Sequence, residues 1–552
     1  MRRHLLSVLM LFAAGAQFSP LLLRAQETAP PATPPVATVD TVTSPDVAPA
    51  AKAPSSSPLE IAEQLYRTGK LDAAAQQYNT LLQSVPNSTL AYVGLSRVYL
   101  KQKRPDDAYK AASKAVELTP GLAAAHVVLG EVYFRQGKIA QAEHEFTAQV
   151  QAGTSVARAY WGLARVYRVN SYYQHAKIMI DQAHTMDPAD PDIRRDWMAT
   201  LSRKERIKEL AGYLGDDTDD DQEDRERMEH GLVLMTQEEE SRSKSCRVVS
   251  KVSSTEMPLE TLMQDAQHLR AFGLKVSFNG ASSRLLLDTG ASGFVIDRKV
   301  AEKAGIQRIV KGNVSGIGDK GAAAGYFGRA DSVKIGEVEF QECLVSVIEK
   351  SSVADGDGLI GADVFSAFLV DLDFANIKFR LSPLPPLPAP SESQTALAAK
   401  YPASARFHDR YVAPEMKSYT PMVRVGHNLL IATKINDLPP KLFLIDTGAF
   451  GNTIAPDAAK EATKVHKDSD IHVKGLSGEV KNVFQTDELT LTFSHYKQRA
   501  LGLVAFDTSP ISNSLGTEVS GMLGFVMLRM MEMKIDYRDG LIDFGFDANR
   551  FH

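Results

Sequence analysis

Cysteine is scarce in this chain, since its 552 residues hold only Cys246 and Cys343. Two thiols can form one disulfide, but they cannot build a disulfide framework or a four-thiolate zinc site. The sequence leaves a bonded pair and two free thiols equally open.

An excess of positive charge is also lacking, because 62 Lys and Arg face 67 Asp and Glu, for a net charge of -5. Without an excess of positive charge, the chain would not attract the phosphates of a nucleic acid, so we expect no nucleic-acid partner.

Complete metal and cofactor signatures are missing too. His144 opens an H-E-x-x-H pattern, but Ala148 stands where the second histidine ligand is required. The glycines within residues 316–321 satisfy G-x-G-x-x-G, which must open a helix to bind a dinucleotide. Residues 322–328 are broken by glycine and do not predict such a helix. We therefore predict no metal site and no organic cofactor.

The length predicts several folding units, because 552 residues exceed what one hydrophobic core usually supports. The amino terminus resembles a secretory signal: two arginines precede the uncharged run 5–16, which ends on a small-x-small site. We predict a signal peptide at 1–25, an exported protein of the periplasm or the extracellular space, and no membrane span after signal removal. The alternative is an uncleaved anchor, because residues 5–23 carry no formal charge.

A fixed period follows a Pro- and Ala-rich linker, which we place at residues 26–58 and predict to be disordered. Small and large apolar residues recur there every 34 positions: Ala74, Ala108, Ala142 and Ala176, and Leu65, Tyr99, Tyr133 and Tyr167. A helix-turn-helix unit of 34 residues explains both columns. Residues 59–190 resemble tetratricopeptide repeats, and the resemblance implies a surface for a protein partner. A generic alanine-rich helical bundle is the alternative.

Residues 191–262 are predicted to form a helical cap followed by an acidic linker. The run 216–229 is dominated by Asp and Glu, and like charges this close repel one another, which favours a solvated segment. Whether residues 216–262 act as an inhibitory prosegment stays open at this point.

The chain becomes β-rich from about residue 263, where alternating runs such as 274–278 are followed by turn signals such as Asn279-Gly280. This region also duplicates itself. Asp-Thr-Gly-Ala occurs twice behind large apolar residues, and a Gly-apolar-apolar-Gly run follows each copy at a similar distance: 288–291 with 358–361, and 446–449 with 521–524. We predict two lobes, at 263–383 and 419–549, joined by a Pro- and Ala-rich linker at 384–418.

The paired motifs resemble those of aspartic peptidases of the pepsin and retropepsin type, over about residues 265–548. The predicted fold class is therefore an all-α tetratricopeptide solenoid followed by a mostly-β bilobal acid-protease fold. The resemblance implies that Asp288 and Asp446 are the catalytic pair of an aspartic endopeptidase acting on a peptide or protein substrate.

The resemblance also assigns supporting roles. The active-site turns would be Thr289, Gly290, Ala291, Thr447, Gly448 and Ala449. The apolar-apolar-Gly segments behind the turns would be Leu359, Ile360, Gly361, Met522, Leu523 and Gly524, with a short helix beginning at residue 362. Candidate flap residues are Gly316, Ile317, Gly318, Gly475 and Leu476, and Tyr326 is a candidate flap tyrosine.

Two adjacent carboxylates cannot both ionise without strong repulsion, so they hold one proton between them. That proton lets one carboxylate accept a proton from water while the other hydrogen-bonds the scissile carbonyl. Many pepsin-like chains have Ser or Thr where this chain has Ala291 and Ala449. Because alanine donates no hydroxyl hydrogen bond to the carboxylates, we expect a less acidic optimum than that of gastric pepsins.

Two other arrangements fit the same sequence. Each lobe could pair with its copy in another chain, which would give a dimer with two sites. The lobes could also be a catalytically silent retropepsin-like binding module on a periplasmic tetratricopeptide scaffold. The intact Asp, Thr and Gly of both motifs argue against the second arrangement.

Overall fold

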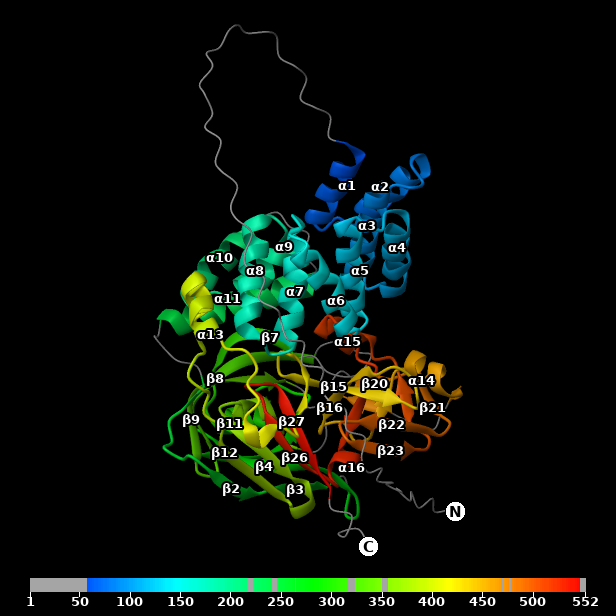
Figure 1. Ribbon diagram of the computed structural model, residues 1–552. Coiled ribbons are helices and arrows are strands. Elements are labelled where there is room, and N and C mark those ends of the chain that lie inside the picture. Colours follow the sequence, from blue (N-terminus) through cyan, green and yellow to red (C-terminus); the bar gives the residue numbers. More distant parts are fainter. Residues whose placement is uncertain are drawn as a thin grey trace.

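The computed structural model describes residues 57–215, 222–240, 246–263, 265–314, 323–349, 356–467, 471, 473–475 and 478–546. Figure 1 shows a helical region stacked on two β-rich lobes, which confirms the predicted fold class. The predicted signal peptide, nearly all of the linker before the repeats, and four candidate flap residues lie outside the described residues: Gly316, Ile317, Gly318 and Leu476. Within the described ranges, no helix is long and apolar enough to cross a membrane.

Helix pairs form the first folded part of the chain. They are α1 (Pro58–Arg67), α2 (Leu71–Ser84), α3 (Thr89–Lys101), α4 (Pro105–Leu118), α5 (Ala123–Arg135), α6 (Ile139–Gln151), α7 (Ala157–Val169) and α8 (Tyr173–Met186). The alanine column lets neighbouring helices approach closely, and Ala74, Ala108 and Ala142 are completely buried. Glycine serves the same end at Gly162, where a Cβ would lie 2.3 Å from the ring of Phe146.

A buried ion-pair network ties the odd-numbered helices of the repeats to α9 (Pro191–Met198). The guanidinium of Arg158 on α7 donates to both carboxylate oxygens of Glu131, at 2.7 and 2.8 Å. The same guanidinium donates to Asp190 at 2.8 Å and to Asp192 at 3.2 Å. These charges are paired within the chain, and such pairing is what makes their burial tolerable.

The acidic segment after α9 is more helical than the sequence predicted. Helix α10 (Arg203–Gly215) follows α9, and α11 (Gln222–Glu240) covers part of the run that was predicted to be a linker. The reason is an apolar stripe, because Met228, Leu232 and Met235 recur at helical spacing and pack on the cluster around Leu210 and Tyr213. Helix α11 also contacts the first lobe through β7 (Arg308–Val314).

The first lobe is a sheet that closes on itself, because β8 pairs with β4 on one side and with β9 on the other. Its strands follow the order β1-β9-β6-β10-β5-β4-β8-β7, with β3 beside β4. Their bounds are β1 (Arg247–Val248), β3 (Glu260–Met263), β4 (Leu269–Phe278), β5 (Ala281–Asp288), β6 (Phe294–Asp297), β8 (Ala323–Ile335), β9 (Val338–Ile348) and β10 (Gly358–Gly361), and α12 (Arg298–Lys303) packs on it.

The second lobe repeats the central strand arrangement of the first. Its order is β18-β21-β24-β17-β25-β16-β15-β22-β23, with β14 beside β15. The strands are β14 (Val423–Val425), β15 (Asn428–Ile435), β16 (Lys441–Asp446), β17 (Thr453–Ile454), β18 (Val465–Lys467), β21 (Val483–Thr486), β22 (Leu489–Phe493), β23 (Tyr496–Ala500), β24 (Val504–Phe506) and β25 (Gly521–Gly524). Three helices accompany them: α14 (Pro456–Ala462), α15 (Ser509–Leu515) and α16 (Phe525–Leu528).

A third sheet joins the lobes, in the order β13-β27-β26-β11-β12-β2. Its strands are β13 (Thr420–Pro421), β27 (Leu541–Gly545), β26 (Glu532–Asp536), β11 (Phe368–Asp373), β12 (Lys378–Pro383) and β2 (Thr255–Pro258). Strand β11 belongs to the first half of the duplication and β26 to the second, and they pair antiparallel. The two halves therefore share backbone hydrogen bonds beneath the site.

The Pro- and Ala-rich segment between the lobes has its own structure. It contains α13 (Glu392–Lys400), η3 (Pro402–Ser404) and η4 (Pro414–Met416). It runs against the turn between α7 and α8, where Tyr173 N donates to His408 O at 3.2 Å and Arg410 N donates to Ser171 O at 2.8 Å. The repeats are therefore fastened to the segment that connects the lobes.

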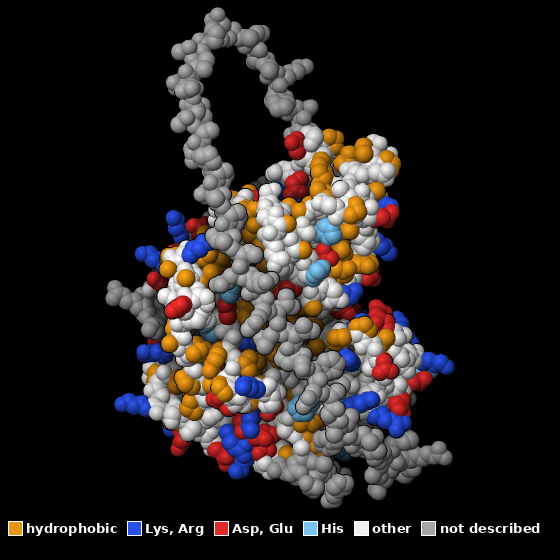
Figure 2. All heavy atoms as spheres, in the orientation of Figure 1, with side chains coloured by type: hydrophobic (Ala, Val, Ile, Leu, Met, Phe, Trp, Pro, Cys, Tyr) orange, Lys and Arg blue, Asp and Glu red, His pale blue; other side chains and the backbone are white. Residues whose placement is uncertain are grey.

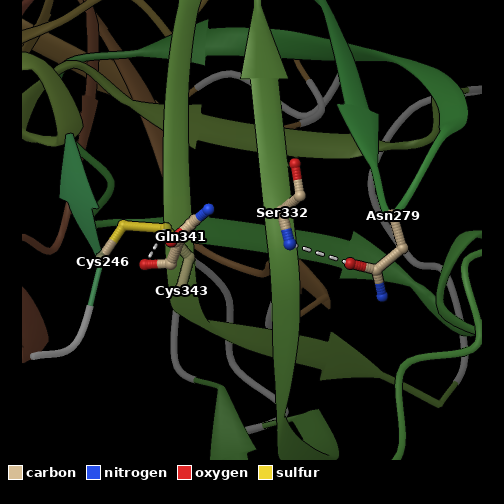
Figure 3. Close-up of a disulfide and its surroundings, with 5 residues drawn as sticks. All are labelled: Cys246, Asn279, Ser332, Gln341 and Cys343. Atoms are coloured by element: carbon tan, nitrogen blue, oxygen red, sulfur yellow. Dashed lines mark hydrogen bonds between the residues drawn. A yellow bond between two sulfur atoms is a disulfide. The ribbon is translucent and has the colours of Figure 1, made fainter. Parts of the chain in front are cut away.

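A disulfide joins Cys246 to Cys343 and so resolves the choice that the sequence left open. Cys246 directly precedes β1, and Cys343 lies in β9, the strand with which β1 pairs. Figure 3 shows the bond between these two strands, with Ser332 N donating to Asn279 Oδ1 on the far side of β8. The crosslink anchors the start of the β-rich region to the closed sheet of the first lobe.

Candidate active site

Each Asp-Thr-Gly motif begins at the last residue of a buried strand. Asp288 ends β5 and Asp446 ends β16. A parallel strand lies beside each of them, and its register places Gly361 opposite Asp288 and Gly524 opposite Asp446. The Gly-apolar-apolar-Gly runs predicted from the sequence are these neighbouring strands, β10 and β25. The predicted short helix after the first run is confirmed as η1 (Ala362–Phe365).

The two turns are locked together by an exchange of hydrogen bonds between their threonines. Thr289 Oγ1 donates to Ile445 O at 2.8 Å, and Thr447 Oγ1 donates to Leu287 O at 2.8 Å. Each threonine also donates its backbone N–H to the other's hydroxyl, at 3.0 and 3.1 Å. Both threonines are 1% exposed, so these bonds form away from water. They fix the ends of β5 and β16 against each other within one chain, and no second copy is needed to complete the pair.

The two carboxylates lie beside these threonine hydrogen bonds, each against the turn of the opposite lobe. A Cβ on Gly448 would lie 2.3 Å from Oδ2 of Asp288, and a Cβ on Gly290 would lie 3.0 Å from both carboxylate oxygens of Asp446. Each aspartate is therefore seated against the turn of the opposite lobe, in space that only glycine leaves free. Backbone donors orient the oxygens: Gly290 N donates to Asp288 at 2.8 Å, and Gly448 N and Ala449 N both donate to Asp446 at 2.9 Å.

The environment of the pair favours a retained proton. Burial raises the pKa of Asp288 well above its ordinary value, and the charge of Asp446 raises it further. Burial also raises the pKa of Asp446, although the N–H groups of Ala449 and Gly448 oppose this. Two such carboxylates titrate as a unit and hold one proton over a range of pH.

Sequence reasoning missed two basic side chains beside the pair, Arg270 and His427. Arg270, at the start of β4, donates from Nη2 to Gly448 O at 3.1 Å, and its charge opposes burial by lowering the pKa of both aspartates. Burial lowers the pKa of His427, while Asp363 and the Gly290 backbone favour its protonated ring. Each lobe thus extends a side chain from the strand region before its own aspartate toward the glycine of the other turn. Local motifs carry no signal for this contact, because it depends on how the lobes pair.

Further polar residues behind the turns were also missed. Asp363 accepts hydrogen bonds from Ser292 Oγ at 2.8 Å and from Gly293 N at 3.0 Å, which steadies the first turn. Asn452 accepts one from Gly524 N at 2.8 Å in the second lobe. Tyr537 is fully buried, and its hydroxyl has no hydrogen-bond partner among the described residues. Burial raises the pKa of this phenol, and the charges of Asp363 and Asp288 add to the effect.

The flap predictions have mixed outcomes. Gly475 lies in β19 (Val473–Gly475), which pairs with β20 (Gly478–Val480) as a short hairpin. The hairpin of β7 and β8 is described up to residue 314 and again from residue 323, so its predicted glycines fall outside the described residues. The interpretation of Tyr326 as a flap tyrosine is wrong. Its side chain is 9% exposed, packs in the lobe core and has the guanidinium of Arg308 4.6 Å from its ring centroid.

Comparisons with known proteins agree with this geometry. The family described as aspartyl protease matches residues 274–364, and the tetratricopeptide repeat family matches residues 59–123 and 127–177. The chain is 30% identical over 165 residues to DNA damage-inducible protein 1 of Neurospora crassa, which covers 28% of this chain and 37% of that protein. The match thus spans well under half the length of this curated relative.

Two solved structures are also similar. An aspartic proteinase from Irpex lacteus covers 53% of this chain and 98% of its own length, at 14% identity and a TM-score of 0.33. A thermophilic tetratricopeptide protein of Thermus thermophilus covers 32% and 97%, at 21% identity and a TM-score of 0.26. The family match includes only the first Asp-Thr-Gly. The place of the second motif in the site rests on the register of β16 with β25 and on the hydrogen bonds exchanged between the two threonines. The chain thus contains a retropepsin-like aspartyl protease domain preceded by tetratricopeptide repeats.

Proposed function

We propose that this protein is an exported aspartic endopeptidase that hydrolyses peptide bonds with a water molecule activated by Asp288 and Asp446. The observation that carries the proposal is the seating of each carboxylate against the glycine of the opposite turn. Two carboxylates held this way, in a buried setting that raises the pKa of both, favour a state with one shared proton.

In the proposed reaction, the ionised carboxylate accepts a proton from water while the water oxygen attacks the scissile carbonyl carbon. The protonated carboxylate donates a hydrogen bond to the carbonyl oxygen and stabilises the charge that develops there. The tetrahedral intermediate then breaks its carbon–nitrogen bond, and the departing nitrogen leaves with a proton from the pair. Atoms and protons balance without a metal or an organic cofactor, and none is part of the proposal.

The test uses purified full-length protein and a peptide library. Asp288→Asn and Asp446→Asn should each abolish cleavage, because neither leaves a carboxylate pair able to share a proton. Asp457→Asn is the matched control, since that side chain is 93% exposed and should not affect cleavage. A statine-type mimic of the tetrahedral intermediate should inhibit the wild type, whereas a chelator should not. Cleavage retained by both active-site variants would contradict the proposal.

Export and recruitment belong to the same proposal. Export to the periplasm or the extracellular space is supported by the amino-terminal sequence and by the Cys246–Cys343 disulfide, because disulfides persist in oxidising compartments. Cell fractionation with thiol alkylation would test it, and a reduced cytoplasmic protein would contradict it.

The repeats are proposed to recruit a protein substrate or partner. Their attachment to the inter-lobe segment would hold that partner at a fixed place relative to the site.

A further inference from the structure

A cavity of about 160 Å³ lies where the repeats meet the inter-lobe segment, away from the carboxylate pair. Helices α7, α8 and α9 form its walls, and Phe407 of the inter-lobe segment contributes a further side. Figure 1 shows these three helices side by side above the lobes. The cavity combines apolar surface, including Ile180 and Phe407, with the side chains of Arg165, Arg168 and Lys177.

Two of the three cations in this cavity already have carboxylate partners. Arg168 donates to Asp196 at 3.3 and 3.4 Å, and Asp196 also accepts from Trp161 Nε1 at 2.8 Å. Lys177 is only 4% exposed and is paired with Asp181. The carboxylate that lines the cavity, Asp196, is therefore already hydrogen-bonded to two donors, and it accepts no hydrogen bond from the third cation.

Arg165 is that third cation. Its guanidinium is held in place by two rings, with Phe134 at 4.0 Å and Trp161 at 4.6 Å from the ring centroids. It makes no hydrogen bond or ion pair with any residue that the structure describes, and burial lowers its pKa. The nearby charges of Asp196, Glu131 and Asp192 stabilise this cation, but none of them accepts a hydrogen bond from it, and its planar fork matches the two oxygens of a carboxylate.

We propose that this cavity binds a carboxylate attached to a compact apolar group, with the carboxylate on Arg165 and the apolar group against Ile180 and Phe407. The small volume excludes large ligands, and the apolar walls disfavour a fully hydrated anion such as phosphate. A free small organic acid and the last residue of a peptide with a free carboxyl terminus both present this chemistry. The site is independent of the proposed peptidase activity.

The test is calorimetric titration of the full-length protein with defined probes. N-acetyl-leucine and a short peptide ending in leucine represent the two sources, and their carboxamide forms are the matched controls. We expect saturable binding of at least one acid, weakened by about tenfold or more when the carboxylate becomes a carboxamide or when Arg165 is changed in Arg165→Met. Arg104→Met is the control variant, because that side chain is 51% exposed and lies outside the cavity.

A second variant protects the test against a folding defect in Arg165→Met. Ala199 lines the cavity but is exposed, so Ala199→Trp should fill the space and abolish binding without disturbing a core position. If only the peptide ending in leucine binds, the ligand is the carboxyl terminus of a peptide. If N-acetyl-leucine binds as well, a small organic acid is enough to occupy the site. No binding of any acid at millimolar concentration, or equal binding of acid and carboxamide, would overturn the proposal.

Discussion

Arg270 adjusts the protonation of the carboxylate pair from outside the two motifs. Burial raises the pKa of Asp288 and of Asp446, whereas the charge of Arg270 lowers both. The backbone acts in the same direction as Arg270, because Ala449 N donates to Asp446 at 2.9 Å where a side-chain hydroxyl is missing. The expectation of a less acidic pH optimum was based on the two alanines alone. The alanines are only one of several contributions, of opposite sign, to the pKa values of Asp288 and Asp446.

Removing the charge of Arg270 should move activity to higher pH. In Arg270→Met the pair loses a cation that favours its ionised form, so both apparent pKa values rise and the singly protonated window moves upward. We expect the acidic and basic limbs of the kcat/KM profile to shift together by about one pH unit. Arg270→Lys keeps the charge and should shift less. A profile that stays in place in Arg270→Met, or moves equally in both variants, would contradict this role.

The residues that could be predicted from sequence are those whose role follows from their immediate neighbours. Asp288 and Asp446 were predictable because Asp-Thr-Gly behind an apolar run predicts a strand end followed by a tight turn. Arg270 and Tyr537 were not, since they approach the site only after strands distant in sequence have paired. Tyr326 was misassigned because its distance from the glycines gave no information on whether it points inward or outward.

At the scale of elements, the sheet that joins the lobes carries a buried acid of its own. Asp536 ends β26, is 0% exposed and accepts a hydrogen bond from Asp539 N at 3.0 Å. Its Oδ2 has no hydrogen-bond partner among the described residues. Burial raises its pKa to about 6, and the charge of Asp539 contributes in the same direction.

This raised pKa makes stability depend on pH in a definite direction. The folded state holds the proton more tightly than the unfolded chain, so the contribution to stability is complete below the unfolded pKa, near 4, and is lost as pH rises through about 6. Asp536→Asn keeps the accepting oxygen without the charge. It should raise the free energy of unfolding by at most about 3 kcal/mol above pH 7 and change it little at pH 4.

Denaturant unfolding at both pH values measures this effect. Asp457→Asn, at a side chain that is 93% exposed, is the control and should change neither value. A gain for Asp536→Asn that is equal at both pH values would show that the acid is not the cause.

Elements differ in how well the sequence predicts them. The repeat helices follow from a 34-residue period in the sequence. That β11 and β26 would pair with each other was not predictable, because no local pattern specifies a partner strand across about 160 residues. Helix α11 was missed because the acidic residues of 216–229 outweighed the apolar stripe that begins at Met228.

At the scale of the whole molecule, the repeats and the second lobe share one hydrophobic core. Side chains of α5, α6 and α7, including Phe134 and Phe146, cluster with Leu442 and Leu444 of β16. Polar bonds reinforce the contact, since Thr517 Oγ1 donates to Phe134 O at 2.7 Å in a fully buried position. Figure 2 shows acidic and basic side chains interspersed over the face in view.

This shared core couples the strand of Asp446 to the repeats, and the coupling can be measured. Leu444 is 4% exposed and lies two residues before Asp446, on the side of β16 that packs against the repeats. Leu444→Ala should lower the free energy of unfolding by about 2–5 kcal/mol, because it removes buried methyl groups and leaves a cavity. Since the repeats share this core, they should unfold at a lower denaturant concentration too, although the substitution is in the lobe.

Tryptophan fluorescence reports that response directly, because the chain's two tryptophans, Trp161 and Trp197, both lie in the helical region. The fluorescence midpoint should fall in Leu444→Ala together with the loss of peptide cleavage. Leu501→Ala is the matched control, since Leu501 belongs to the same lobe but is 70% exposed and should leave the midpoint in place. If cleavage were lost earlier while the fluorescence midpoint stayed unchanged, the repeats and the lobe would unfold separately, and the repeats could not hold a partner rigidly over the site.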